Sequence, residues 1–259
     1  MAEQHTIIWI SGASEGIGRG IANMVPYPNA RIISLSRRVH PELETVQFDL
    51  TKPDTWKYVG ESFERELANF AGKRAIFIHN AIYRTTGAYV ADPDTDMGRY
   101  YDEMIANGVA PHFLGDMFLR AVRPGYESGL AMITSSCAVN PYEGGSSYCS
   151  SKASVEMWVR VVRRELKTRN RDSWVVAIRP GFVDTPNTRF KATLSAHDYP
   201  AGEQIAKQLA SGEGMLTEDE AGRGIWSMLP PKEDDEILHQ GSRIIVPMTD
   251  DVQGIGSAR

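Results

Sequence analysis

The chain has 259 residues, of which 42% are hydrophobic and 24% charged, and its formal net charge is −5. This length and apolar content suffice for one sizeable α/β domain with a full core, and the acidic balance argues against a nucleic acid or an anionic membrane as partner. No apolar run approaches the roughly 18–20 residues of a membrane span, and the N-terminus shows no signal-peptide pattern.

The first predicted strand covers residues 6–10, a continuous apolar run typical of a strand that is covered on both faces. Glycines with the spacing G-x-x-x-G-x-G follow it and open a helical stretch that ends before Pro26. Such glycines let the backbone approach a phosphate, and the helix N-terminus adds N–H donors and a positive dipole end. The pattern is a variant of the dinucleotide fingerprint. We assign to the coenzyme Gly12, Ser14, Glu15, Gly16, Ile17 and Gly18.

The second predicted strand, residues 30–35, ends at Ser36, Arg37 and Arg38. Ser36 lies 18 residues after Gly18, about where NAD-binding folds carry an acid for the ribose 2′-hydroxyl. Arginine suits a phosphate dianion, so these residues predict NADP rather than NAD. The alternative is two solvated surface arginines. Glu15 also argues against NADP, because NADP enzymes often carry a base in the glycine loop.

The third and fourth predicted strands cover residues 45–50 and 75–81, and a helix over residues 54–70 separates them. Asp49 and Leu50 end the third strand and are expected beside the adenine. Asn80 and Ala81 end the fourth. A strand-end asparagine is often only a turn former, but in this series of strand ends it could support the ribose. A polar loop over residues 84–98 and a long helix over about 98–122, with Asn107 in its middle, are predicted next.

A proton-transfer site is predicted where a strand over residues 129–134 ends at Ser135. A loop rich in Pro and Gly follows, and a helix opens near Tyr148 and runs to about residue 167. Tyr148 and Lys152 lie one helical turn apart on one face. A lysine cation there favours the phenolate of a tyrosine whose ordinary pKa is about 10, and Ser135 could hydrogen-bond the substrate oxygen. The alternative is an ordinary helix start carrying a surface lysine.

The last third of the chain begins with a predicted strand over residues 174–178, which ends near Pro180, Gly181, Val183 and Thr185. Residues 186–216 have weak periodicity and are read equally well as a mobile flap over the substrate or as a surface insertion. The spacing of Thr217 and Glu220 predicts a capping box, with a helix to residue 229. A last strand over residues 243–246 and a loose tail after residue 248 complete the chain. Strands that alternate with helices predict a parallel sheet in one domain.

Together these motifs resemble the short-chain dehydrogenases/reductases over about residues 5–250. The resemblance implies an α/β single-domain Rossmann fold with a doubly wound, mostly parallel seven-stranded sheet. It is carried by Gly12-x-x-x-Gly16-x-Gly18, Asn80-Ala81, Asn107, Ser135, Tyr148-x-x-x-Lys152 and Pro180-Gly181.

The resemblance also implies the role of each site residue. Tyr148 would be the general acid/base, and Lys152 would hold the nicotinamide ribose and lower the pKa of that tyrosine. Ser135 would orient the carbonyl, with Ser136 as its rival, and Asn107 would support a water that connects Lys152 to solvent. Val183 and Thr185 match positions that contact the carboxamide and the phosphates.

Residues 136–142 with Tyr148-Cys149 resemble the sepiapterin reductase and benzil reductase branch. Two positions depart from that pattern: Ile82 replaces a glycine, and Ile244 and Ile245 stand where an acidic pterin anchor is expected. We therefore expect an NADP-dependent oxidoreductase that transfers a hydride between the nicotinamide and a small carbonyl or alcohol. Candidate pocket walls are Tyr83, Tyr142, Phe182 and Phe190.

Two other classes of function compete with this expectation. A regulator that senses the dinucleotide without turnover would usually lack the tyrosine or the lysine. A sugar-nucleotide epimerase would need a longer C-terminal part. Cys137 and Cys149 lack a C-x-x-C partner, which favours the cytoplasm, and the six histidines lack metal-ligand spacing, so no metal is expected. A homodimer or homotetramer through the helices over residues 98–122 and 148–167 is the default.

Overall fold

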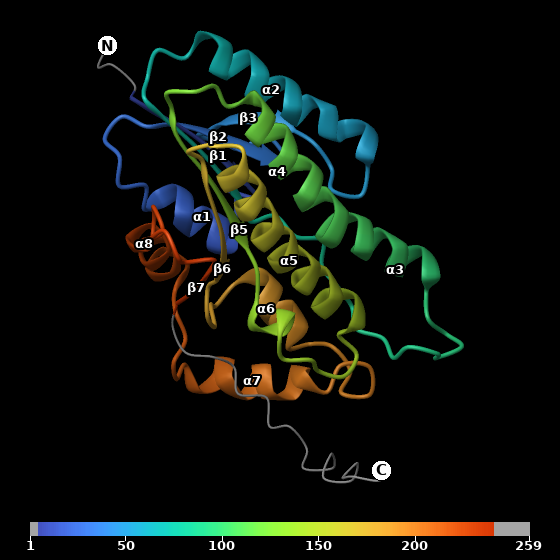
Figure 1. The fold of residues 1–259 in the computed structure, drawn as a ribbon. Coiled ribbons are helices and arrows are strands. Elements are labelled where there is room, and N and C mark those ends of the chain that lie inside the picture. The colour runs from blue at the N-terminus through green and yellow to red at the C-terminus, as the bar shows by residue number, and fades with distance from the viewer. Residues whose placement is uncertain (1–4, 241–259) are drawn as a thin grey trace, which may run out of the picture.

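The computed structural model describes residues 5–240, which form one seven-stranded sheet (Figure 1). The strand order is β3-β2-β1-β4-β5-β6-β7, and every neighbouring pair is parallel. The strands are β1 (Thr6–Ser11), β2 (Arg31–Ser36), β3 (Glu44–Gln47), β4 (Arg74–His79), β5 (Glu127–Ile133), β6 (Trp174–Arg179) and β7 (Ile237–His239). The order reverses between β1 and β4, the switch point where doubly wound sheets bind ligands. The predicted doubly wound, seven-stranded Rossmann fold is confirmed.

Helices cover both faces of the sheet (Figure 1). On one face lie α2 (Trp56–Asn69), α4 (Ala110–Ala121) and α5 (Ser146–Thr168), and on the other lie α1 (Gly16–Asn23) and α8 (Glu218–Ser227). Side chains of β1 alternate between the two cores, because successive residues of a strand point to opposite faces. Trp9 packs with the α2 side, and Ile8 and Ile10 pack with the α1 side. This explains the uninterrupted apolar run of the first strand.

The long helix expected over residues 98–122 is divided by a π-helical turn. It consists of α3 (Met97–Met104), the π turn (Ile105–Val109) and α4. Pro111 has no N–H and therefore cannot complete the i, i+4 hydrogen bond to the carbonyl of Asn107. The wider turn thus surrounds the one residue of this helix that the sequence singled out, and such turns are frequent at functional sites.

β3 and β7 differ from the strands that the sequence predicts. β7 was not predicted, whereas the strand expected over residues 243–246 and the tail after residue 248 lie outside the described residues and stay predictions. β3 ends at Gln47, so Asp49 and Leu50 lie in the turn after it. Asp49 organises this turn, since its carboxylate accepts hydrogen bonds from Thr51 and its carbonyl accepts them from the side chains of Thr55 and Trp56.

Residues 186–216 form two helices rather than an irregular loop. These are α6 (Pro186–Lys191) and α7 (Ala201–Ser211), which pack against each other. Ala201 and Ile205 of α7 form an apolar cluster with Phe182 and Tyr199. The capping box of α8 is confirmed, with Thr217 and Glu220 bonding each other's backbone N–H. No helix between residues 5 and 240 is long and apolar enough to cross a membrane.

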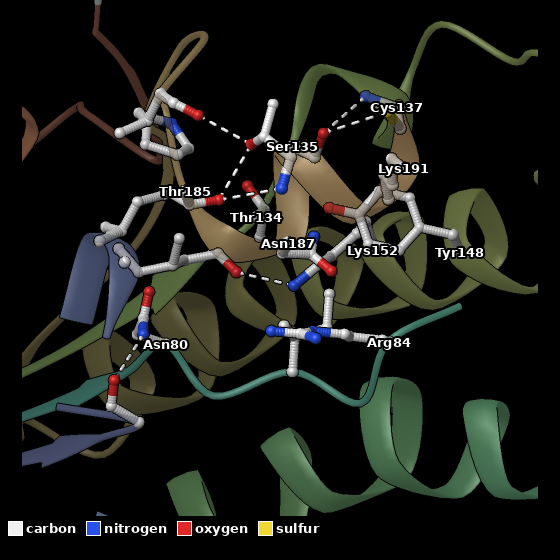
Figure 2. A pocket seen from close by; sticks show the side chains of 18 of the residues that line it. Asn80, Arg84, Thr134, Ser135, Cys137, Tyr148, Lys152, Thr185, Asn187 and Lys191 are labelled. Carbon is white, nitrogen blue, oxygen red and sulfur yellow. Dashed lines mark hydrogen bonds between the residues drawn. The ribbon is translucent and has the colours of Figure 1, made fainter. Parts of the chain in front are cut away.

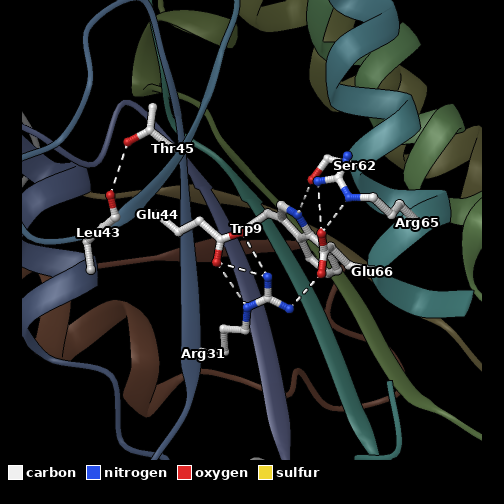
Figure 3. A network of polar contacts seen from close by, with 8 residues as sticks. All are labelled: Trp9, Arg31, Leu43, Glu44, Thr45, Ser62, Arg65 and Glu66. Atoms are coloured by element: carbon white, nitrogen blue, oxygen red, sulfur yellow. Dashed lines mark hydrogen bonds and ion pairs between the residues drawn. The ribbon is translucent and has the colours of Figure 1, made fainter. Parts of the chain in front are cut away.

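A polar network stabilises the sheet at the end opposite to the strand carboxyl termini (Figure 3). Arg31, the first residue of β2, pairs with Glu44 of β3 at 2.8 Å and with Glu66 of α2 at 2.6 Å. The indole of Trp9 donates to the hydroxyl of Ser62 at 3.2 Å. These contacts link two strands to α2 away from the site.

Candidate active site

A cleft of about 1940 Å³ opens at the carboxyl ends of the strands. Of the catalytic and coenzyme-binding residues predicted from the sequence, Gly18 and Asn107 do not line it. The predicted residues that do are Gly12, Ser14, Glu15, Gly16, Ile17, Ser36, Arg37, Arg38, Asp49, Leu50, Asn80, Ala81, Ser135, Tyr148, Lys152, Pro180, Gly181, Val183 and Thr185. The fold therefore brings side chains from all parts of the chain to one edge of the sheet, as expected for parallel strands.

The glycine loop between β1 and α1 depends on close backbone packing. Gly12 has a φ of +72°, which favours glycine. A Cβ on Gly18 would lie 2.0 Å from the carbonyl oxygen of Gly12 and 2.6 Å from Nδ2 of Asn80. Asn80 itself donates to the carbonyls of Ser11 and Gly12. Gly18 and Asn80 thus shape the loop.

The start of α1 is a site where an anion is favoured, because backbone N–H groups and the positive dipole end meet there. A carboxylate oxygen of Glu218, at the start of α8, accepts from Gly16 N at 2.9 Å, and the other accepts from Arg19 Nε at 2.6 Å. The glycine loop and this helix start fit the diphosphate of a dinucleotide.

A buried histidine supports the same loop from behind. The Ser11 hydroxyl accepts from the backbone N–H groups of Asn80 and Ala81 and donates to Nδ1 of His79 at 3.2 Å. Burial lowers the pKa of His79 to about 3, with the cation of Lys152 as the next cause. The imidazole is therefore neutral at physiological pH.

The predicted residues of the turn at Ser36 differ in whether another side chain or the backbone already engages them. The Ser36 hydroxyl donates to the carbonyl of Arg38, and the Arg38 guanidinium lies 3.8 Å from a carboxylate oxygen of Glu15. Glu15 also pairs with Arg84 at 3.1 Å. Arg37 is exposed at the cleft, and no carboxylate among residues 5–240 forms an ion pair with it. Of the two arginines, Arg37 is the one free to meet a ligand.

One part of the cleft, called the substrate half below, brings together Ser135, Tyr148 and Lys152 (Figure 2). Ser135 follows β5 and caps a 3₁₀ turn (Ser136–Ala138), with its hydroxyl donating to the sulfur of Cys137 at 3.1 Å. Tyr148 and Lys152 lie one turn apart on α5. Lys152 Nζ lies 5.8 Å from the centroid of the Tyr148 ring and donates to the carbonyl of Ile133 at 3.0 Å.

The protonation of this group is governed by burial. Burial raises the pKa of the Tyr148 phenol above its ordinary value, and the Ser135 hydroxyl opposes that rise. This direction is opposite to the lowering expected from Lys152. The reason is that burial disfavours the charged form of each group, the phenolate of Tyr148 and the ammonium of Lys152. Burial, followed by the cation of Lys191, lowers the pKa of Lys152 to about 8.

The Asn107 side chain does not line the cleft and instead forms hydrogen bonds with the backbone of Tyr83. The side chain accepts from Tyr83 N at 2.8 Å and donates to the carbonyl of Tyr83 at 2.9 Å. It thereby fixes the segment after β4. The backbone carbonyl of Asn107 has no α-helical donor, because Pro111 lacks an N–H.

Sequence reasoning missed several residues of the substrate half. Lys191 is only 7% exposed, and its Nζ lies 3.6 Å from the centroid of the Tyr148 ring. Tyr199 and Asn187 also line the cleft. The available signal was Thr185-Pro186, since a threonine followed by proline is a helix start. It places Asn187 and Lys191 one turn apart on α6.

The expected aromatic walls are placed as follows. Tyr83, Tyr142 and Phe182 line the cleft, as does Ile82. Phe190 does not line it and instead lies under the guanidinium of Arg84, 5.7 Å from it. Ser136, the rival of Ser135, also lines the cleft.

Comparison with known proteins identifies the family. A family model described as short chain dehydrogenase matches residues 6–194. The chain belongs to the short-chain dehydrogenases, which are oxidoreductases that act on CH–OH and C=O groups and use NAD(P).

One curated relative indicates the branch. A benzil reductase of Bacillus subtilis, described as forming (S)-benzoin, is 28% identical over 212 residues, which are 78% of this chain and 85% of that protein. The predicted kinship with the benzil reductase branch is confirmed, whereas the likeness to sepiapterin reductases stays a prediction.

Solved structures show the same fold. A short-chain dehydrogenase from Streptomyces avermitilis has a TM-score of 0.72 and 19% identity and covers 93% of this chain and 89% of that one. A short-chain dehydrogenase from Burkholderia cenocepacia in complex with NADP has a TM-score of 0.70 and 18% identity, with coverage of 94% and 99%.

Proposed function

We propose that this protein is an NADP-dependent reductase of small carbonyl compounds, with Tyr148 as general acid/base. The observation that carries the proposal is the convergence of Ser135, Tyr148 and Lys152 in the same cleft as the glycine loop. A phenol, a hydroxyl and an ammonium there are the groups that a carbonyl oxygen needs when it gains negative charge and then a proton.

In the proposed reaction Ser135 turns its hydroxyl from Cys137 toward the substrate oxygen and donates a hydrogen bond to it. Tyr148 donates its proton to that oxygen as the C=O group becomes CH–OH. The dinucleotide, when bound, supplies the hydride. A phenol whose pKa burial has raised is protonated before the reaction, which suits a general acid in the direction of reduction.

Lys152 and Asn107 have the supporting roles. Lys152 Nζ donates to the carbonyl of Ile133, and Lys152 lines the cleft, so it can bind a ribose hydroxyl there. The freed carbonyl of Asn107 is proposed to hold a water through which the proton of Tyr148 is restored from solvent.

The proposed preference for NADP rests on the turn after β2. Arg37 is exposed at the cleft and free of ion pairs within the described residues, and no acid follows β2 at the position of Ser36. A 2′-phosphate would meet a guanidinium there, whereas the free ribose of NAD would lack its usual carboxylate. The pairing of Arg38 and Arg84 with Glu15 offsets the negative charge that Glu15 brings to the loop.

The remaining parts of the proposal concern the whole protein. Residues 1–259 would form one domain. Exposed apolar side chains on α4 and α5, among them Phe113, Met157 and Val161, support a homodimer or homotetramer through these helices. Cys137 and Cys149 are both free thiols, which fits a cytoplasmic location.

The test of the activity is a steady-state assay of NADPH oxidation with benzil, other diketones and aromatic ketones. Tyr148→Phe should lower kcat by about 1000-fold, because general acid–base catalysis contributes on that order, and should leave the Kd for NADPH within a few-fold. Tyr101→Phe, an exposed tyrosine of α3, serves as control. A Tyr148→Phe protein that retained most of the activity would remove Tyr148 from the reaction.

A further inference from the structure

A second lysine lies against the face of the proposed acid/base. Lys191 is the last residue of α6 and is 7% exposed. Its Nζ lies 3.6 Å from the ring centroid of Tyr148 and 5.8 Å from that of Tyr199 (Figure 2). The ammonium therefore lies beside the ring whose hydroxyl is the proposed proton donor.

No hydrogen bond or ion pair between residues 5 and 240 holds the charge of Lys191. The faces of Tyr148 and Tyr199 lie beside its Nζ, and the Cys137 and Cys149 thiols and Glu103 are the groups that favour its charge. Lys152, by contrast, donates to a carbonyl. A buried cation of this kind costs stability unless a partner compensates it, and burial lowers its pKa.

The nearby buried acids are already engaged. Glu103 accepts hydrogen bonds from Thr86 N and from the Ser147 hydroxyl. Glu156 forms a bidentate pair with Arg179. Neither carboxylate forms an ion pair with Lys191, so the carboxylate of a ligand can take that place, in addition to the Cys137 and Cys149 thiols that favour the charge of this lysine.

A separate observation points to the same place. The Oδ1 atom of Asn187 is buried and has no hydrogen-bond partner among the described residues. Asn187 lines the cleft one helical turn before Lys191, on the same face of α6. Turning over the amide group places an N–H donor at that position. An ammonium and an amide donor on one helix face suit the two oxygens of a carboxylate.

We propose that Lys191, with Asn187, binds a carboxylate bonded directly to the reacting carbonyl carbon, so that the preferred substrates are 2-oxo acids and their 2-hydroxy acid products. The inference rests on the proposed function, because the carbonyl has to lie at Tyr148. It narrows that function to a charged substrate, whereas the name of the Bacillus subtilis relative refers to a neutral diketone.

The kinetic test uses a matched pair of substrates, phenylglyoxylate and its methyl ester, which share the reacting carbonyl and differ in charge. The wild-type protein should show the higher kcat/KM for the acid. Lys191→Met should lower kcat/KM for the acid by about 100-fold, the order of effect when one partner of a buried charge pair is removed. The value for the ester should fall at least about tenfold less than the value for the acid, and Lys191→Arg should restore part of the acid activity.

The matched control is Lys207→Met, which removes an exposed lysine of α7 and should change neither value. An equal loss for acid and ester in Lys191→Met would overturn the proposal and make Lys191 a positioning residue for Tyr148. A wild-type preference for the ester would overturn it as well.

A binding measurement separates this inference from the proposed function. Mandelate and methyl mandelate are titrated into the protein with NADP⁺ by calorimetry, which requires no turnover. Mandelate should bind the wild type at least about tenfold more tightly than the ester does, and Lys191→Met should abolish the difference. Lys191-dependent binding of mandelate without reduction of either ketone would contradict the proposed reaction and retain the carboxylate site. Equal binding of acid and ester would contradict the carboxylate site alone.

Discussion

The two halves of the cleft are built in different ways. The coenzyme half consists of backbone and turns: the glycine loop, the turn at Ser36 and the strand-end Asn80, where close packing decides the shape. The substrate half consists of ionisable side chains that are withdrawn from water, among them Tyr148, Lys152 and Lys191. The coenzyme half therefore depends on glycines, whose lack of a side chain permits close backbone packing. The substrate half depends on ionisable groups whose burial costs solvation free energy.

The most severe change to the coenzyme half is Gly18→Ala. The added Cβ would lie 2.0 Å from the carbonyl oxygen of Gly12, so the loop has to move. We expect the Kd for NADPH to rise by about 100-fold or more and the melting temperature to fall, as in other overpacked sites. Fluorescence titration and thermal unfolding measure both. Gly98→Ala, whose Cβ would lie 3.3 Å from the side chain of Asp96, is the control. Unchanged affinity in Gly18→Ala would show that the loop shape is not what binds the coenzyme.

A smaller effect is expected at the rim of the same half. Arg37→Ala should raise the Kd for NADPH by about tenfold, or about 1.4 kcal/mol, and leave the Kd for NADH nearly unchanged, because only NADPH carries the 2′-phosphate. Arg38→Ala should have less effect, since Arg38 lies near Glu15. Equal losses for the two coenzymes in Arg37→Ala would place recognition of the 2′-phosphate elsewhere.

The substrate half contains Lys152, whose protonation should make the affinity for NADPH depend on pH. The pKa of Lys152 is lowered from 10.5 to about 8, so its ammonium is present below about pH 8 and is lost as the pH rises through that value. The affinity for NADPH should therefore fall above pH 8, by at most about tenfold per pH unit for one proton. Titrations between pH 6.5 and 9.5 measure it, and Lys152→Met should give a flat profile. An equally steep profile in that variant would exclude Lys152 as the group that titrates.

The last expected effect concerns the histidine beneath the glycine loop and acts on stability rather than on binding. An unfolded histidine titrates near 6.5 and folded His79 near 3, so the unfolded state binds the extra proton between these values. Stability is present in full above pH 6.5 and falls as the pH is lowered toward 3, by about 1.4 kcal/mol per pH unit. Urea unfolding at several pH values should show a shallower loss in His79→Asn.

Exposed His197 provides an opposite control, because its hydrogen bond to Asp198 raises its pKa. Its contribution to stability is present at acidic pH and is lost as the pH rises, so His197→Asn should make the acid form less stable. Identical acid profiles for His79→Asn and the wild type would mean that His79 is protonated in the folded protein.

The sequence predicted well which residues gather around the glycine loop, because the signals there are local. Strand, glycine spacing and strand-end asparagine are all visible within short windows, and the helical spacing of Tyr148 and Lys152 is local too. Lys191 could not be found in this way, since it meets Tyr148 across 43 positions of the chain. The π turn at Asn107 was also missed, although Pro111 was its visible cause. β7 escaped notice because a three-residue strand carries almost no pattern.

The hydrogen bonds of Glu218 to Gly16 and Arg19 at the start of α1 have a consequence for which fragments of the chain can fold. The Gly16 amide is satisfied by a carboxylate 202 residues further on, and Gly20 packs so closely against α8 that a Cβ there would lie 1.8 Å from the carbonyl oxygen of Glu218. During synthesis on the ribosome, the first turn of α1 therefore lacks its carboxylate partner until Glu218 of α8 has been made. An N-terminal fragment that ends before α8 should emerge as an unfinished nucleotide pocket, and splitting the gene product there would not yield an autonomous binding module.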